Sequence, residues 1–161
     1  MLGAVDLAVL RAFRTRGHTR ALERGAGLLS LLGEHGALWL GICAAGGLVS
    51  RDNRGPYARA AKTVLGTYAL NQAIKFVVRR PRPRMEDLPP LAGTVSSLSY
   101  PSAHTATSLA GARMLAGLLP GAPLYTLATL TALSRLYLGV HYPSDIVAGA
   151  ALGSAVAELA S

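Results

Sequence analysis

The chain has 161 residues, a length that suits one domain. Hydrophobic residues make up 51% and charged residues 15%, which excludes a disordered chain and argues against an ordinary water-soluble domain. The formal net charge of +8 indicates an anionic partner, but aromatic residues are only 6% and the basic residues interrupt apolar runs. That pattern is not typical of a nucleic-acid binder, so we expect a membrane protein with no nucleic-acid partner.

The first segment in chain order, residues 6–24, places leucines among five arginines. A basic helix with an apolar face lies in the interface of an anionic membrane. We therefore expect residues 1–27 to contain a basic amphipathic surface helix that precedes the rest of the domain.

Five apolar segments follow, each with few charges and many small residues: 28–49, 60–78, 103–119, 123–140 and 144–160. The first two are about long enough to cross a bilayer, and small residues allow membrane helices to pack closely. In the last segment, Gly149 and Gly153 form a GxxxG pair that we expect to face inward. The pattern predicts an all-α fold, a polytopic membrane bundle of about five transmembrane helices within residues 28–160. Buried helices of a soluble protein are the alternative.

The longest connection, residues 79–100, is interrupted by four prolines and a glycine, which makes it a candidate functional loop. Counting spans places this loop, the N-terminal segment and the junction 141–143 on one side of the membrane. With Lys75 and Arg82 set aside as site residues, that side carries eight basic residues and the other side four. The positive-inside rule therefore predicts a multi-pass protein of the cell membrane whose loop side faces the cytoplasm.

Three clusters of polar residues occur at span ends on that side. Charged side chains at membrane depth are costly, so we interpret them as functional. The clusters are, in chain order, Lys75 and Arg82; Ser102, Ala103 and His104; and Arg135, His141 and Asp145.

The chemistry of these clusters points to a phosphate. Arg82 and Arg135 offer planar guanidinium groups that match phosphate oxygens, and Lys75 adds a compact positive charge. Ser102 stands at an expected helix N-cap, where the backbone N–H groups of the next two residues are free to bind an anion. Together these groups can stabilise the charge of a phosphoryl transition state.

Two histidines can divide the remaining work. His141 and Asp145 are spaced for an oriented imidazole with one ring nitrogen free to attack. His104 is then available to protonate the departing oxygen.

The three clusters resemble the motifs of the type 2 phosphatidic acid phosphatase family, which read K-x6-RP, PSGH and SR-x5-H-x3-D, in the same order over residues 75–145. The family includes lipid phosphatases, glucose-6-phosphatase-like enzymes and vanadium haloperoxidases. The resemblance implies a metal-independent phosphoric monoester hydrolase without a cofactor. In that reaction His141 forms a phosphohistidine, Asp145 orients it and His104 is the general acid. The residues implied to hold the phosphate are Lys75, Arg82, Ser102, Ala103 and Arg135.

Ala103 departs from the family pattern, which has glycine at this position. If the residue supplies only its backbone N–H, alanine is harmless and favours the helix. If the position requires a positive φ or a very close approach to the phosphate, alanine lowers activity. We expect the harmless case.

The short chain and its basic leader are similar to small actinobacterial members of the family. That resemblance implies a polyprenyl-linked phosphate, decaprenylphosphoryl-5-phosphoribose of arabinan precursor synthesis, and membrane lipids as the other partners. Undecaprenyl pyrophosphate and phosphatidylglycerophosphate are alternatives within the class. A vanadate-dependent oxidase and a non-enzymatic membrane scaffold are alternatives outside it, and the oligomeric state stays open.

Three polar residues inside the apolar segments have no place in these motifs. Glu34 and Arg113 could form a buried ion pair that holds the bundle together. We expect His35 to be an interior histidine with a structural role.

Overall fold

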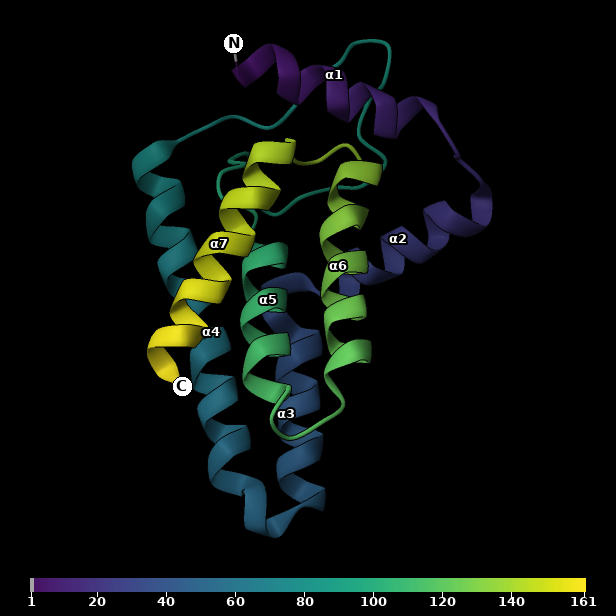
Figure 1. Cartoon of the computed structure of the whole chain (residues 1–161). Helices are drawn as coiled ribbons and strands as arrows, with labels where there is room; N and C mark the ends of the chain where they lie inside the picture. Colours follow the sequence, from purple (N-terminus) through teal and green to yellow (C-terminus); the bar gives the residue numbers. More distant parts are fainter. Residues whose placement is uncertain (1) are drawn as a thin grey trace.

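The computed structural model describes residues 2–161, and within that range every regular element is helical (Figure 1). An isolated bridge between Pro81 and Leu98 ties the long loop to itself. The elements are α1 (Leu2–Thr15), α2 (Arg20–Leu32), the 3-10 turn η1 (Glu34–Gly36), α3 (Ala37–Val49), the 3-10 turn η2 (Arg51–Asn53), α4 (Arg54–Val78), α5 (Ala103–Leu115), α6 (Gly121–Tyr137) and α7 (Pro143–Ala160).

Helix α5 is the centre of the bundle and packs against α4, α6 and α7 (Figure 1). The close approach of α7 depends on its glycines, as predicted. A Cβ atom at Gly149 would lie 2.6 Å from the carbonyl oxygen of Ser102, and one at Gly153 would overlap the backbone of Ala106. The inward orientation of this GxxxG face is therefore confirmed.

The apolar core lies between α3, α4, α5 and α6. Trp39 is fully buried, and its indole N–H donates to the Ser108 hydroxyl over 2.9 Å. A Cβ atom at Gly111 would lie 2.6 Å from the Trp39 ring, so a glycine is required where this ring crosses α5. The other buried residues of this core are Cys43, Tyr57, Ala60, Val64, Ala112, Leu115, Leu124 and Ala128.

The apolar segment of residues 28–49 is not one continuous helix. Helix α2 ends at Leu32, and α3 leaves the turn η1 at an angle of 55° to it. The cause is local, because His35 and Gly36 have φ values of 54° and 76°, which end an α-helix. Hydropathy alone does not detect this break, since the residues around it are apolar.

The expected single helix over residues 6–24 is also two helices, since α1 ends at Thr15 and α2 begins at Arg20, capped by the Thr19 side chain. Helix α1 lies across the end of the bundle, over the start of α7 and the end of α6 (Figure 1). Its buried stripe is Asp6, Leu10 and Arg14. The face toward the protein thus carries two charged residues.

Taken singly, none of the helices in residues 2–161 combines the length and the apolar composition needed to cross a membrane. The bent pair formed by residues 20–32 and 34–49 meets both conditions when it is taken as one unit.

Candidate active site

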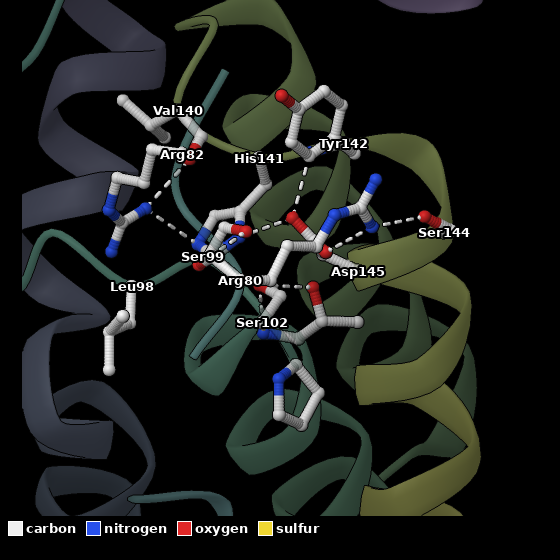
Figure 2. A network of polar contacts seen from close by, with 12 residues as sticks. Arg80, Arg82, Leu98, Ser99, Ser102, Val140, His141, Tyr142, Ser144 and Asp145 are labelled. Atoms are coloured by element: carbon white, nitrogen blue, oxygen red, sulfur yellow. Dashed lines mark hydrogen bonds and ion pairs between the residues drawn. The ribbon is translucent and has the colours of Figure 1, made fainter. Parts of the chain in front are cut away.

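The three predicted clusters meet at the end of the bundle where α4 and α6 end and α5 and α7 begin. Figure 2 shows one or two residues of each cluster: Arg82, Ser102, His141 and Asp145. They surround a cavity of about 40 Å³, which has room for a few water molecules or a small anionic group. Six of the eight predicted site residues line it: Lys75, Arg82, Ala103, His104, Arg135 and His141. The other two, Ser102 and Asp145, are fully buried and do not line the cavity.

Two basic side chains anchor the long loop around the cavity. The Lys75 ammonium, in the last turn of α4, donates to the carbonyl oxygens of Leu98 and Ser99, each over 3.2 Å. Arg82 donates through Nε to the Ser96 carbonyl at 2.7 Å and through Nη1 to the Val140 carbonyl at 2.7 Å. The long loop, which contains Arg82 of the motif, is thereby attached to the end of α4 and to the segment before α7.

Arg135 approaches the cavity from α6 and is 2% exposed. Its Nη1 donates to the Ser30 hydroxyl on α2. Its Nε has no hydrogen-bond partner among the described residues. An unpaired guanidinium donor in a buried site is costly, and an anion in the cavity is a suitable partner.

Helix α5 begins at the cavity. Ser102 is its N-cap, and its hydroxyl accepts from the backbone N–H of Thr105. The N–H groups of the first helical turn have no partner within the helix, so Ala103 and His104 present theirs at the helix start. Ala103 lies in the helix and is not among the residues with positive φ, so alanine fits this position without strain.

His141 is held by a partner on each ring nitrogen (Figure 2). Arg82 Nη1 lies 3.1 Å from its Nε2, and because arginine can only donate, Nε2 carries a lone pair. The other nitrogen, Nδ1, therefore bears the proton and donates to Asp145 Oδ2 over 3.3 Å. Burial and the nearby positive charges of Arg82, Arg135 and Lys75 hold the pKa of His141 well below its ordinary value. The imidazole is thus neutral, with the lone pair on Nε2.

His104 contacts the protein through its Nε2, which donates to the backbone carbonyl of Ser30 over 2.9 Å. The same turn of α2 therefore holds both His104 and Arg135. To protonate a leaving group, His104 must exchange this hydrogen bond or carry a second proton on Nδ1.

Residues 56–161 match the family model of the PAP2 superfamily. The chain belongs to this superfamily. It is 44% identical over 126 residues to decaprenylphosphoryl-5-phosphoribose phosphatase of Mycolicibacterium smegmatis, a match that covers 78% of this chain and 69% of that one. The enzyme of the same name from Mycobacterium tuberculosis H37Rv is 40% identical over 157 residues, covering 97% of this chain and 86% of that one.

The fold is similar to the crystal structure of a transmembrane PAP2-type phosphatidylglycerolphosphate phosphatase from Bacillus subtilis. The TM-score is 0.81 at 25% identity, and the match covers 98% of this chain and 83% of that one. These findings confirm the prediction of a phosphoric monoester hydrolase and indicate a membrane protein.

The PAP2 site of this chain includes an anchor for Asp145 that sequence reasoning missed. Asp145 Oδ2 accepts from the backbone N–H of Tyr142 at 2.9 Å, and Oδ1 accepts from Arg80 Nη1 at 2.9 Å (Figure 2). Arg80 also donates to Asp6 on α1 over 2.7 Å and lies 4.0 Å above the Tyr142 ring. In the sequence, Arg80 is only one of the basic residues counted on the loop side, and no sequence signal connects it with Asp6.

Helix α1 therefore contributes to the support of the candidate site. Asp6 accepts from the backbone N–H of Ser144 at 2.9 Å and from its hydroxyl at 2.5 Å. Burial alone would raise the pKa of Asp6, but its hydrogen bonds with Arg80 and Ser144 lower it below the ordinary value. The first helix thus carries an ionised carboxylate that fixes the start of α7.

Other lining residues were not predicted as site residues: Glu34, Tyr68, Gln72, Thr94, Val95 and Ser96. Helix periodicity identifies two of them as candidates, because Tyr68 and Gln72 lie seven and three positions before Lys75 and so share its face of α4. The loop residues 94–96 lie between prolines in a stretch without periodicity, so no pattern points to them.

Two further expectations about polar residues are wrong. Arg113 forms an ion pair with Glu158 on α7 and not with Glu34, which lies in the turn η1 and lines the cavity. His35 is exposed, and its ring packs edge-on against Tyr68 with centroids 5.4 Å apart. The break in the first apolar segment turns both Glu34 and His35 away from the positions expected for a straight span.

In the described part of the chain, His, Cys, Asp and Glu side chains form no cluster of three or more that could hold a metal ion. The absence of a metal or cofactor from the reaction stays a prediction from the family resemblance.

Proposed function

We propose that this PAP2 protein removes the 5-phosphate from decaprenylphosphoryl-5-phosphoribose through a phosphohistidine on His141. Two observations support the substrate: the chain is 40–44% identical to phosphatases named for it, and one match covers 97% of the chain. Undecaprenyl pyrophosphate and phosphatidylglycerophosphate are the alternative substrates.

The observation that carries the mechanism is the neutral His141, whose Nε2 lone pair faces Arg82 at the cavity wall. An incoming phosphate competes for the Arg82 guanidinium, because a charged oxygen is a stronger acceptor than an imidazole nitrogen. The lone pair is then released beside the phosphorus atom. Attack by Nε2 forms the N–P bond, and Asp145 stabilises the positive charge that develops on the ring.

The remaining groups act on the oxygens. Lys75, Arg82, Arg135 and the N–H groups at the start of α5 stabilise the charge on the phosphoryl oxygens. As the P–O bond of the substrate breaks, His104 protonates the departing sugar oxygen. In the second step His104 takes a proton from water and the water oxygen attacks phosphorus. The N–P bond then breaks, which releases inorganic phosphate and neutral His141.

The arrangement in the membrane belongs to the same proposal. The bent pair α2–α3 and helices α4 to α7 form about five spans, with α1 in the interface and the site at the cytoplasmic end. Helix α4 has 25 residues and is about 37 Å long, more than the hydrocarbon core of a bilayer. Large apolar side chains on the outside of the bundle support lipid contact, with Val49, Phe76 and Val77 being 87%, 67% and 82% exposed. A site at this boundary binds a headgroup while the lipid tail stays in the bilayer.

Phosphate release by the purified protein in detergent with EDTA tests the proposal. The panel contains decaprenylphosphoryl-5-phosphoribose, undecaprenyl pyrophosphate, phosphatidylglycerophosphate and phosphatidic acid. We expect the fastest release from the phosphoribose lipid, and radiolabelled phosphate bound to the protein that is absent in His141→Ala. Faster release from another lipid would overturn the substrate, and labelling that persists in His141→Ala would overturn the nucleophile.

A further inference from the structure

Glu34 is the only carboxylate that lines the cavity among the described residues, and it shares this cavity with Lys75, Arg82 and Arg135. A carboxylate next to a bound phosphate repels the phosphate, so Glu34 by itself weakens phosphate binding in this cavity. A carboxylate is a suitable partner, in contrast, for hydroxyl groups, which donate to its two oxygens. We infer that Glu34 and its uncharged neighbours bind the two adjacent hydroxyls of a sugar whose phosphate occupies the cavity. This inference rests on the proposed function.

The backbone holds Glu34 in this position. The next two residues, His35 and Gly36, have φ values of 54° and 76°. A positive φ is unfavourable for histidine and persists only where the surroundings impose it. The preceding residue, Gly33, is equally constrained, since a Cβ atom there would lie 2.8 Å from the His104 ring. The backbone is therefore constrained on both sides of Glu34.

The break between α2 and α3 is attached to the phosphate-binding residues. Ser30, one turn before Glu34, accepts from His104 through its carbonyl and from Arg135 through its hydroxyl. Glu34 is thus attached through Ser30 to Arg135, which binds the phosphate in the proposed reaction, and to His104, which protonates the departing sugar oxygen. A carboxylate in this fixed position can discriminate between phosphate esters by the group that is attached to the phosphate.

The neighbours of Glu34 in the cavity complete a surface suited to hydroxyl groups. Tyr68 and Gln72 project from α4, and the Gln72 amide donates to the Tyr68 hydroxyl over 3.3 Å. Thr94 and Ser96 belong to the long loop and also line the cavity. Amide and hydroxyl groups both donate and accept, which matches sugar hydroxyls. The cations on α4, α6 and the loop bind the phosphate, and this uncharged rim with Glu34 binds the sugar.

The test compares two substrates in two variants. The substrates are decaprenylphosphoryl-5-phosphoribose and its 2,3-dideoxy analogue, which keeps the phosphate and the lipid but lacks the adjacent hydroxyls. The variants are Glu34→Gln and, as a matched control, Glu86→Gln, which removes the same charge from an exposed loop position. For each protein the measured quantity is the ratio of kcat/KM for the ribose lipid to kcat/KM for the analogue.

We expect wild type and Glu86→Gln to prefer the ribose lipid. In Glu34→Gln we expect the kcat/KM ratio to be at least about tenfold lower, because a hydrogen bond to a charged group is replaced by a weaker one. An unchanged ratio in Glu34→Gln overturns the inference. If kcat/KM falls equally for both substrates, Glu34 has a structural role; if it rises equally for both, Glu34 only reduces the positive charge of the cavity. If the wild-type protein does not hydrolyse the ribose lipid at all, the proposed function has failed first, and that result is read before any variant is made. A thermal melt confirms that each variant is folded.

Discussion

The two ends of the helical bundle are built from the same helices, but the interior is apolar at one end and polar at the other. Along one face of α4, the buried residues change from Ala60 and Val64 to Thr67, Asn71 and Lys75. The first two contribute to the apolar core around Trp39, whereas Asn71 donates to the Pro101 carbonyl and Lys75 faces the cavity. One helix face therefore serves stability in one half and chemistry in the other.

Helices α5 and α6 show the same division. Helix α6 runs from Leu124 and Ala128 in the apolar half to Ser134 and Arg135 at the site end. Helix α5 runs in the opposite direction along the bundle and begins with its polar residues, His104 among them. The apolar half gains from close packing, which is tolerant of small losses spread over many contacts. The site end depends on a few directed hydrogen bonds, so single changes there have large and specific effects.

The largest effect in this comparison is expected from His141→Ala. We expect removal of the proposed nucleophile to lower kcat by at least about a thousandfold, because the remaining groups only bind the phosphate. Phosphate release measures the loss, and a thermal melt checks that the apolar half still holds the fold. His18→Ala is the matched control, since His18 stacks on Tyr137 outside the cavity. A similar loss in the control would mean that the effect is not specific to the site.

Arg80→Ala tests whether Arg80 positions Asp145. We expect kcat to fall by about 10- to 100-fold with little change in KM, because Asp145 loses one anchor while the phosphate-binding residues remain in place. The control is Arg79→Ala, which removes the neighbouring exposed arginine. An increase of KM at constant kcat would contradict the role of Arg80 as a positioning residue and would indicate direct substrate binding.

Gly153→Ala tests the packing of α7 on α5. The added Cβ atom would overlap the backbone of Ala106, so we expect a loss of about 1–3 kcal/mol in the free energy of unfolding. Gly66→Ala is the control, since a Cβ atom at Gly66 meets nothing within 4 Å and alanine favours the helix. Denaturant unfolding in detergent measures both variants. Equal stability of the two would show that α5 and α7 do not pack as described.

The smallest effect concerns pH. The pKa of His141 lies well below its ordinary value in the folded protein, so the unfolded chain binds a proton near pH 6.5 that the folded chain does not bind. Stability therefore falls as pH decreases below about 6.5, by up to about 1.4 kcal/mol per pH unit from this group. Unfolding curves at pH 7.5 and 5.5 measure the fall. In His141→Gln we expect a smaller fall, and an unchanged one would show that this histidine is protonated in the folded state.

The sequence was sufficient for the parts of the site that follow from short-range spacing. The clusters around Lys75, His104 and His141 each occupy one helix end, and six of the eight predicted residues line a single cavity. The bundle and its inward GxxxG face also follow from local patterns. Periodicity and spacing describe a face of one element, and these features are of that kind.

The remainder depends on one local break in the backbone and on contacts between distant segments. The break at His35 arises from two positive φ values, and the apolar composition around it predicts a straight helix instead. Glu34 therefore faces the cavity, while Arg113 pairs with Glu158. The bond between Asp6 and Arg80 joins residues 74 positions apart, a distance at which no spacing rule applies.

The contact between α1 and α7 also bears on how the protein becomes active during synthesis. Asp6 hydrogen-bonds to Ser144, which follows it by 138 positions, and Arg80 joins Asp6 to the carboxylate that orients His141. Because α1 and α7 are far apart in the sequence, the proposed orientation of His141 requires that α7 has been synthesised and packed against α1. In the proposed reaction, a nascent chain that lacks α7 is therefore inactive, and activity begins only after α1 and α7 are in contact.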